Sequence, residues 1–140
     1  ILLAGVGGQE QRYRRLIAEL GVEDRVQLVG GFSEAEKHVF YARCLGVAFV
    51  PKDEDYGYIT LEGMLAAKPV ITCTDSGGPL EFVQHEQTGY VLPPNPQQLA
   101  AVIDRLYEDK AAARAMGEAG RAAYDAAEIS WHNVIDKLLV

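Results

Sequence analysis

A buried strand, a glycine turn and a helix follow one another in the stretch Val47-Ala-Phe-Val50-Pro-Lys-Asp-Glu54-Asp-Tyr-Gly57-Tyr-Ile-Thr-Leu-Glu62. The apolar run at its start is typical of a strand that is buried on both faces. Gly57 allows a turn, and the apolar residues Leu61, Met64 and Leu65 then recur at helical spacing. A strand followed by a helix is the repeating unit of α/β proteins.

The same order of strand and helix repeats along the rest of the chain. Apolar runs predict buried strands at residues 1–4, 26–29, 47–50, 70–72 and 90–92. Helix signals lie between and after them: the stripe that ends at Gly21, the capping box Ser33-x-x-Glu36, the pair Asn95-Pro96, the Ala-rich stretch 111–124 and the cap Ser130. We predict one α/β domain over residues 1–140, a Rossmann-like, doubly wound parallel sheet with helices on both faces.

The composition excludes several classes of protein. A net charge of −7 argues against binding to nucleic acid or to a membrane surface, since both depend on clustered Lys and Arg. Cys44 and Cys73 stand apart in apolar segments, which favours buried thiols over a disulfide. The sequence has no apolar run of the ~20 residues that span a bilayer and no signal sequence, so a cytoplasmic location is the default.

The stretch from Glu54 to Glu62 has the richest chemistry. The first N–H groups of a helix have no internal partners and attract anions, so a diphosphate is expected near Tyr58, Ile59 and Thr60, after the turn at Gly57. The Thr60 hydroxyl is a further candidate donor. Glu62 is expected in the first turn of this helix, where its carboxylate suits the two hydroxyls of a ribose. Glu54 would contact a sugar hydroxyl or stabilise positive charge at an anomeric carbon.

An alternative without any ligand accounts for the same residues equally well. A glutamate in the first turn of a helix is stabilised by ~0.3–1 kcal/mol through the helix dipole alone. The three acidic residues 53–55 would then form a solvated loop. The residues by themselves leave these two interpretations open.

Glycine-rich loops follow three of the other predicted strands. Gly5, Gly7 and Gly8 follow the first, but Glu10 stands where a dinucleotide-binding fingerprint requires glycine, so we reject a nicotinamide site. The second loop contains Gly30, Gly31 and Phe32, and the third reads Asp75-Ser-Gly-Gly-Pro79 and is expected to lead into a helix. For each, a structural turn is favoured over the display of backbone amides to a ligand.

The sequence gives no sign of a metal site or of a nucleophilic triad. His38, His85 and His132 are not spaced with Cys, Asp or Glu as metal ligands would be. A Gly-x-Ser-x-Gly elbow is also absent. We therefore expect neither a metal nor a cofactor.

The order of these motifs resembles that of the group 1 glycosyltransferases, the retaining enzymes of family 4 with the GT-B fold. The resemblance covers nearly the whole chain, and its most specific part is the Glu-x7-Glu signature formed by Glu54 and Glu62. Further matching motifs are Lys68-Pro-Val70, Asp75-Ser-Gly-Gly78, Thr88-Gly89, Met116-Gly-Glu-Ala-Gly120 and Ser130-Trp131.

The resemblance implies the C-terminal half of a GT-B fold, which binds a nucleotide diphosphate sugar and requires no metal. By the same resemblance, Glu62 holds the donor ribose and Glu54 faces the donor sugar. The backbone from Gly57 to Thr60 meets the sugar and the diphosphate. Gly30, Gly31 and Phe32 lie near the base, and Gly5, Gly7 and Gly8 lie at the cleft between domains.

The resemblance also implies parts that the chain lacks. The family has an Arg and a Lys after an earlier strand, and an N-terminal domain that binds the acceptor glycan or lipid-linked acceptor. Since the sequence opens within a strand and without Met, we expect a fragment that does not catalyse transfer alone. Asp55 and Gly63 replace the family's usual Gly and Ala.

Two rival functions stay open on the sequence alone. A sugar phosphorylase or epimerase of the same fold is one, although no lysine stands out as the cofactor ligand of a phosphorylase. A non-catalytic module, such as a receiver-like regulatory domain, is the other. Against it, Ala4-Gly5 stands at the end of the first strand, where a receiver has an acidic pair.

Overall fold

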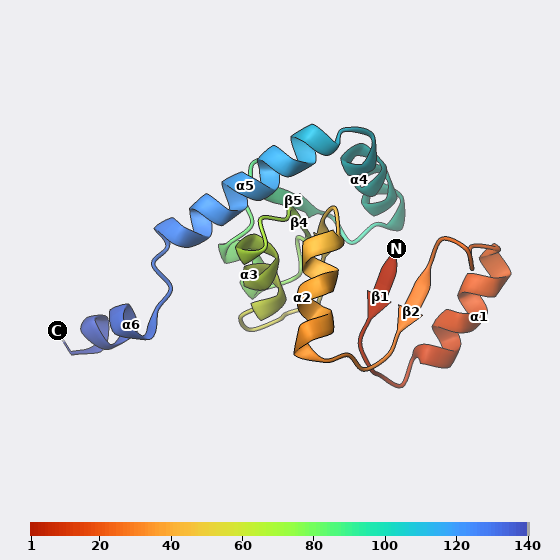
Figure 1. Cartoon of the computed structure of the whole chain (residues 1–140), viewed down its shortest axis with the longest axis horizontal. Helices are drawn as coiled ribbons and strands as arrows, with labels where there is room; N and C mark the ends of the chain where they lie inside the picture. The colour runs from red at the N-terminus through yellow and green to blue at the C-terminus, as the bar shows by residue number, and fades with distance from the viewer. Residues whose placement is uncertain (140) are drawn as a thin grey trace. The chain divides into compact units, whose positions relative to one another are not determined.

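The computed structural model describes residues 1–139, which form two compact units, Ile1–Phe40 and the described residues from Tyr41 onward. Each unit contains a parallel sheet (Figure 1). Within the units the strands pair in the orders β1-β2 and β3-β4-β5, and every pairing is parallel, as expected for an α/β fold. Among the described residues, β1 pairs only with β2, and β3 only with β4.

The first unit contains β1 (Leu2–Ala4), α1 (Glu10–Leu20) and β2 (Gln27–Val29), and α2 (Glu34–Arg43) begins in it. Its predicted helix ends are confirmed. Gly21 has a left-handed φ of 61° and its N–H donates to the Ala18 carbonyl, which closes α1. The Ser33 N–H donates to a Glu36 carboxylate oxygen at 2.8 Å, and the Glu36 N–H to Ser33 Oγ at 3.3 Å, so the capping box opens α2.

β1 is exposed and β2 is at most half-buried, whereas the sequence predicted buried strands. Leu2 and Leu3 of β1 are 45% and 41% exposed, and no described residue up to Phe40 is fully buried. Two three-residue strands and one helix offer too little surface to enclose a side chain. Their apolar composition is therefore not matched by burial within this unit.

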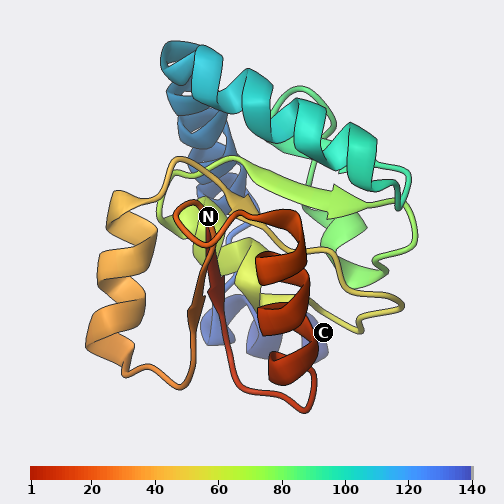
Figure 2. The same ribbon diagram turned by 90° about the vertical axis from the view of Figure 1, so that its right-hand side faces the viewer.

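The second unit has a parallel sheet with helices on both faces (Figures 1 and 2). Its strands are β3 (Val47–Ala48), β4 (Val70–Cys73) and β5 (Gly89–Leu92), and its helices are α3 (Tyr58–Leu65), the short 3-10 helix η1 (Gly78–Glu81), α4 (Pro96–Glu108), α5 (Lys110–Ala126) and α6 (Trp131–Leu138). All five predicted strands are present. η1 is a single turn where a full helix was expected after Pro79.

The helix starts predicted in this unit are also confirmed. Asn95 Oδ1 accepts from the N–H groups of Gln97 and Gln98, both at 3.0 Å, at the start of α4. Ser130 Oγ accepts from the Asn133 N–H at the start of α6. The described cysteines carry free thiols, of which Cys73 is buried and Cys44 half-buried.

Two apolar clusters hold the helices on this sheet. The first joins Ile71, Tyr90 and Leu92 of the sheet to Leu106 of α4 and Ala113 of α5. The second joins Val70 of β4 to Leu61 and Met64 of α3 and to Val83. Helix α5 contributes to both clusters, with Ala123 and Tyr124 against the second. Because Val70 and Thr72 are fully buried, β4 is the centre of the core.

Two glycines of α5 lie in different surroundings. A Cβ placed at Gly117 would overlap the Ala67 carbonyl at the end of α3, whereas one at Gly120 would meet its nearest atoms at 3.6–3.7 Å, an ordinary contact. The backbones of α5 and of the segment after α3 therefore approach each other directly at Gly117.

This difference predicts opposite effects of the same substitution in one helix. Gly117→Ala is expected to lower the free energy of unfolding by about 1–3 kcal/mol through overpacking. Gly120→Ala should raise it by up to ~1 kcal/mol, because alanine is the better helix former. Urea unfolding of both variants measures this, and equal effects would contradict the close approach at Gly117.

Candidate functional site

The start of α3 presents two backbone donors, the N–H groups of Tyr58 and Ile59. Gly57 precedes the helix with a left-handed φ of 77°, and a Cβ there would also meet Pro79 Cγ at 2.8 Å, so glycine is required on both counts. Among the described residues, no acceptor is found for the N–H groups of Tyr58 and Ile59. Such unpaired donors carry the positive end of the helix dipole and attract anions.

Thr60 differs from the expectation based on the sequence. Its N–H donates to the Gly57 carbonyl at 2.9 Å, so it is not free for a ligand. Its hydroxyl is fully buried and has no hydrogen-bond partner in the described part of the chain. As it stands, Thr60 presents neither group at the surface, because its side chain faces the core rather than the start of the helix.

Glu54 lies on the exposed loop before α3, and its backbone is fixed by the loop after β4. The Glu54 N–H donates to the Ser76 carbonyl at 3.0 Å, and the Gly78 N–H donates to the Glu54 carbonyl at 2.7 Å. These bonds extend the parallel pairing of β3 and β4 beyond the strand ends, with Glu54 opposite Gly77. The loop after β4 thus orients the segment that carries Glu54.

Ser76 anchors this second loop from inside. Its side chain is fully buried, and its hydroxyl accepts from the Cys73 N–H and donates to the Pro51 carbonyl, each at 3.0 Å. A Cβ at Gly77 would lie 2.5 Å from the Glu54 carbonyl oxygen. The structural interpretation of the Asp75–Pro79 motif therefore applies: its glycines let two backbones meet, and the Gly78 amide is already used.

Glu62 is the fifth residue of α3, in the second turn and not in the first turn as expected. Because the dipole acts within the first turn, it does not account for a glutamate at this position. The half-buried Glu62 carboxylate accepts a hydrogen bond from the Tyr41 hydroxyl at 2.8 Å. Burial, and next the bond to Glu62, raise the pKa of the Tyr41 phenol, so Tyr41 stays protonated.

No pattern in the sequence marks Tyr41 as a site residue. Its contact with Glu62 spans 21 residues of the sequence, and no local pattern marks a tyrosine at the end of a helix as the partner of a carboxylate on another helix.

Glu62 and Tyr58 both line a hollow of about 350 Å³ beside α3. The other lining residues are mostly apolar: Tyr56, Leu61, Leu65, Tyr124, Ile129 and Ser130. The Tyr56 ring packs on Tyr58 with 5.0 Å between centroids and on Phe82 with 5.5 Å. Glu54 does not line this hollow. The structure therefore brings Tyr58 and Glu62 to one surface and leaves Glu54 on the adjoining loop.

The glycine loops of the first unit meet at the carboxyl ends of β1 and β2. Gly5, Gly7 and Gly30 line a hollow of about 290 Å³, and the Gly5 N–H donates to the Val29 carbonyl at 3.0 Å. Gly8 and Gly31 do not line it. Phe32 packs edge-on against Phe40, with centroids 5.7 Å apart.

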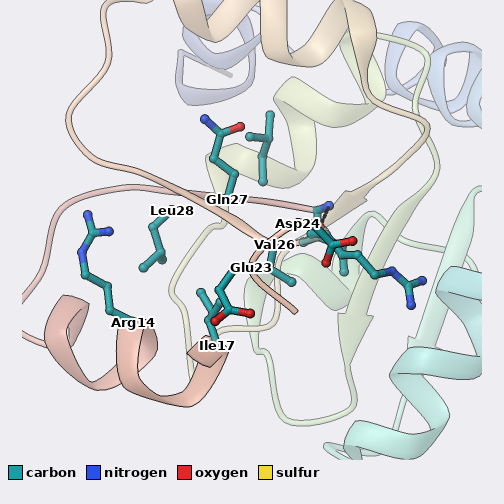
Figure 3. A pocket seen from close by; sticks show the side chains of 10 residues that line it. Arg14, Ile17, Glu23, Asp24, Val26, Gln27 and Leu28 are labelled. Carbon is teal, nitrogen blue, oxygen red and sulfur yellow. Dashed lines mark hydrogen bonds between the residues drawn. The ribbon is translucent and has the colours of Figure 1, made fainter. Parts of the chain in front are cut away.

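A larger hollow of about 660 Å³ opens at the amino ends of β1 and β2. Arg14, Glu23 and Asp24 lie around it beside apolar residues such as Ile17 and Leu28 (Figure 3). None of the predicted site residues lies there. Ligands of parallel sheets bind beyond the carboxyl ends of strands, so this hollow is not a candidate for the donor site.

The described part of the chain has neither a metal-binding cluster nor a membrane-spanning helix. Among residues 1–139, no group of three or more His, Cys, Asp or Glu side chains is arranged to hold a metal ion. None of the helices there combines the length and the apolar character that crossing a membrane requires.

Comparison with known proteins identifies the family. Residues 1–123 match the family described as glycosyl transferases group 1. The chain belongs to this family. It is 30% identical over 112 residues to human alpha-1,3/1,6-mannosyltransferase ALG2, a match that covers 80% of this chain and 27% of the human protein.

A second relative and a solved structure support the family and the fold. The chain is 32% identical over 146 residues to the GDP-mannose-dependent alpha-(1-6)-phosphatidylinositol monomannoside mannosyltransferase of Mycobacterium tuberculosis, covering 99% of this chain and 37% of that protein. Anabaena HepE in complex with UDP-glucose superposes with a TM-score of 0.75 and 28% identity, over 88% of this chain and 35% of HepE.

The fold is therefore that of the C-terminal part of GT-B glycosyltransferases, as the sequence predicted. The chain spans only about a third of the length of these relatives.

The contact between the loop that carries Glu54 and the loop after β4 predicts a long-range effect of substituting Gly77. Gly77→Ala should cost about 1–3 kcal/mol of stability and shift the backbone amide resonances of residues 53–55. Gly21→Ala is the matched control, because Gly21 also has a positive φ but no atom within 4 Å of its added Cβ. A Gly77→Ala variant with unchanged amide shifts at Glu54 would contradict the anchoring.

Proposed function

We propose that this chain is the donor-binding domain of a retaining glycosyltransferase that acts in glycan or polysaccharide biosynthesis. The observation that carries the proposal is the pair of N–H groups at Tyr58 and Ile59, which find no acceptor among residues 1–139 and lie between the two glutamates of the signature. Membership of the group 1 family and the likeness to HepE, a protein solved with UDP-glucose, support it.

In this proposal the start of α3 binds the diphosphate of the donor. Tyr58 and Ile59 donate backbone hydrogen bonds to phosphate oxygens, and Gly57 lets the phosphate approach the chain closely. Negative charge on the diphosphate grows as the sugar leaves, so donors fixed in advance stabilise the transition state more than the ground state. Thr60 contributes through the shape of the turn, since its N–H donates to the Gly57 carbonyl and its hydroxyl is buried.

The two glutamates have different tasks in the proposal. Glu62 accepts hydrogen bonds from the two ribose hydroxyls, for which a carboxylate has enough lone pairs. Glu54 faces the donor sugar, where it binds a hydroxyl or stabilises positive charge at the anomeric carbon. The proposed chemistry assigns no role to a metal ion or a cofactor.

The roles that the resemblance gives to the first unit stay predictions. The loop of Gly30, Gly31 and Phe32 is predicted to lie near the base of the donor. The loop of Gly5, Gly7 and Gly8 is predicted to lie at the cleft between domains. The acceptor, a glycan or lipid-linked glycan, is proposed to bind outside residues 1–140. A cytoplasmic setting also remains a proposal.

The names of the relatives suggest the donor. Human ALG2 is a mannosyltransferase, and the mycobacterial relative is described as GDP-mannose-dependent. We therefore propose GDP-mannose as the first donor to test, with UDP-glucose second because it occupies HepE.

Two rivals fit less well. Membership of the group 1 family argues against a receiver-like module. A phosphorylase would need a lysine for its cofactor, and the Lys68 ammonium instead donates to the Ala42 carbonyl at 3.2 Å.

The ribose contact predicts that Glu62→Gln weakens every nucleotide ligand. Loss of hydrogen bonds to a charged acceptor should lower the affinity for both GDP and GDP-mannose by about tenfold or more. Isothermal calorimetry on the wild type and the variant measures this. Glu108→Gln, at the exposed end of α4, is the matched control and should bind as the wild type does. Full affinity in Glu62→Gln would refute the ribose role.

The sugar contact predicts a different pattern for Glu54→Gln. This variant should bind GDP as the wild type does and GDP-mannose about three- to tenfold more weakly, because only the sugar loses a partner. The same titrations with UDP and UDP-glucose test the second donor. An equal loss for the diphosphate and the sugar nucleotide would place Glu54 at the nucleotide instead.

A further inference from the structure

The hydrogen bond from Tyr41 to Glu62 joins the end of α2 to the second turn of α3. The two oxygens are 2.8 Å apart, a short distance that is typical of an O–H donor on a carboxylate. Tyr41 is half-buried, and the raised pKa of its phenol keeps the proton on the donor at every physiological pH. The Tyr41 hydroxyl is thus a permanent hydrogen-bond donor to one oxygen of the carboxylate, Glu62 Oε2.

A carboxylate that binds a diol has a geometric requirement. Both hydroxyls must meet lone pairs in the plane of the carboxylate, yet the terminal torsion of a glutamate is broad and only weakly restricted. A side chain that rotates freely would lose this freedom on binding, which costs affinity. A fixed donor on one oxygen restricts the rotation before the ligand arrives.

We propose that Tyr41 is a positioning residue that orients the Glu62 carboxylate for the two hydroxyls of the donor ribose. This inference rests on the proposed function, because it assumes that Glu62 binds the ribose. In this role Tyr41 acts only through Glu62 and needs no contact with the ligand. The consequence of this positioning is selectivity for ribonucleotides. The site distinguishes a ribonucleotide from its 2′-deoxy counterpart because the Glu62 carboxylate is aligned for both ribose hydroxyls.

The test compares ribonucleotides with 2′-deoxyribonucleotides by isothermal calorimetry. GDP, UDP and ADP are each titrated beside the matching 2′-deoxynucleoside diphosphate. The wild type should prefer the ribonucleotide by about tenfold or more, as expected where a site hydrogen-bonds a hydroxyl. In Tyr41→Phe, ribonucleotide affinity should fall about three- to tenfold while 2′-deoxynucleotide affinity changes little, so that the preference nearly disappears.

Two controls separate positioning from a merely structural role. Tyr107→Phe removes a hydroxyl from an exposed tyrosine of α4, whose ring lies near the Lys110 ammonium, and should keep the ribose preference. The double variant Tyr41→Phe with Glu62→Gln should show no further loss of preference beyond Glu62→Gln alone, because the two residues act as one unit.

Each outcome decides the proposal. An unchanged ribose preference in Tyr41→Phe overturns the positioning role and leaves the proposed function standing. Equal losses for ribo- and 2′-deoxynucleotides also overturn it, since Tyr41 would then act only through the packing of the helices. A folded wild type that binds none of the six nucleotides would contradict both the proposed function and the inference.

Discussion

The backbone pairing between Glu54 and the loop after β4 holds the candidate site in shape. The hydrogen bonds from Glu54 to Ser76 and from Gly78 to Glu54 continue the parallel ladder past the end of β3, where a connection would otherwise be mobile. Buried Ser76 ties this extension to the core through Pro51 and Cys73. The turn at Gly57 and the first turn of α3 follow from that anchored segment.

Burial within the second unit provides a firm support for this site. β4 is fully buried between two apolar clusters, and α3 packs on one of them through Leu61 and Met64. The start of α3 therefore has a fixed place relative to β4 and its loop. A rigid support of this kind lets backbone donors act without reorganisation when a charged ligand binds.

The local signals in the sequence predicted most of the fold. Gly21, Ser33 and Asn95 specify helix ends through neighbours within three residues, so their roles follow from spacing alone. The exposure of β1 could not be predicted, because apolar composition does not reveal how much surface surrounds a strand.

The site was predicted only in part, because some of its residues are neighbours in the sequence and others are not. Glu54, Gly57 and Glu62 lie close together in the sequence, and the glycine turn between them made the start of the helix recognisable. The role of Tyr41 could not be predicted, because its bond to Glu62 joins two separate helices. The inward orientation of Thr60 depends on the helical phase of α3, which is set by where the helix begins and by the core beneath it.

The central claim is that the first N–H groups of α3 bind a diphosphate. Backbone amide resonances recorded during a titration with GDP-mannose and with UDP-glucose test it most directly. The account predicts that the largest shifts occur at Tyr58 and Ile59, and that the nucleoside without phosphates leaves these two resonances unchanged. Shifts confined to the hollow around Arg14 and Glu23, with Tyr58 and Ile59 unaffected, would contradict it.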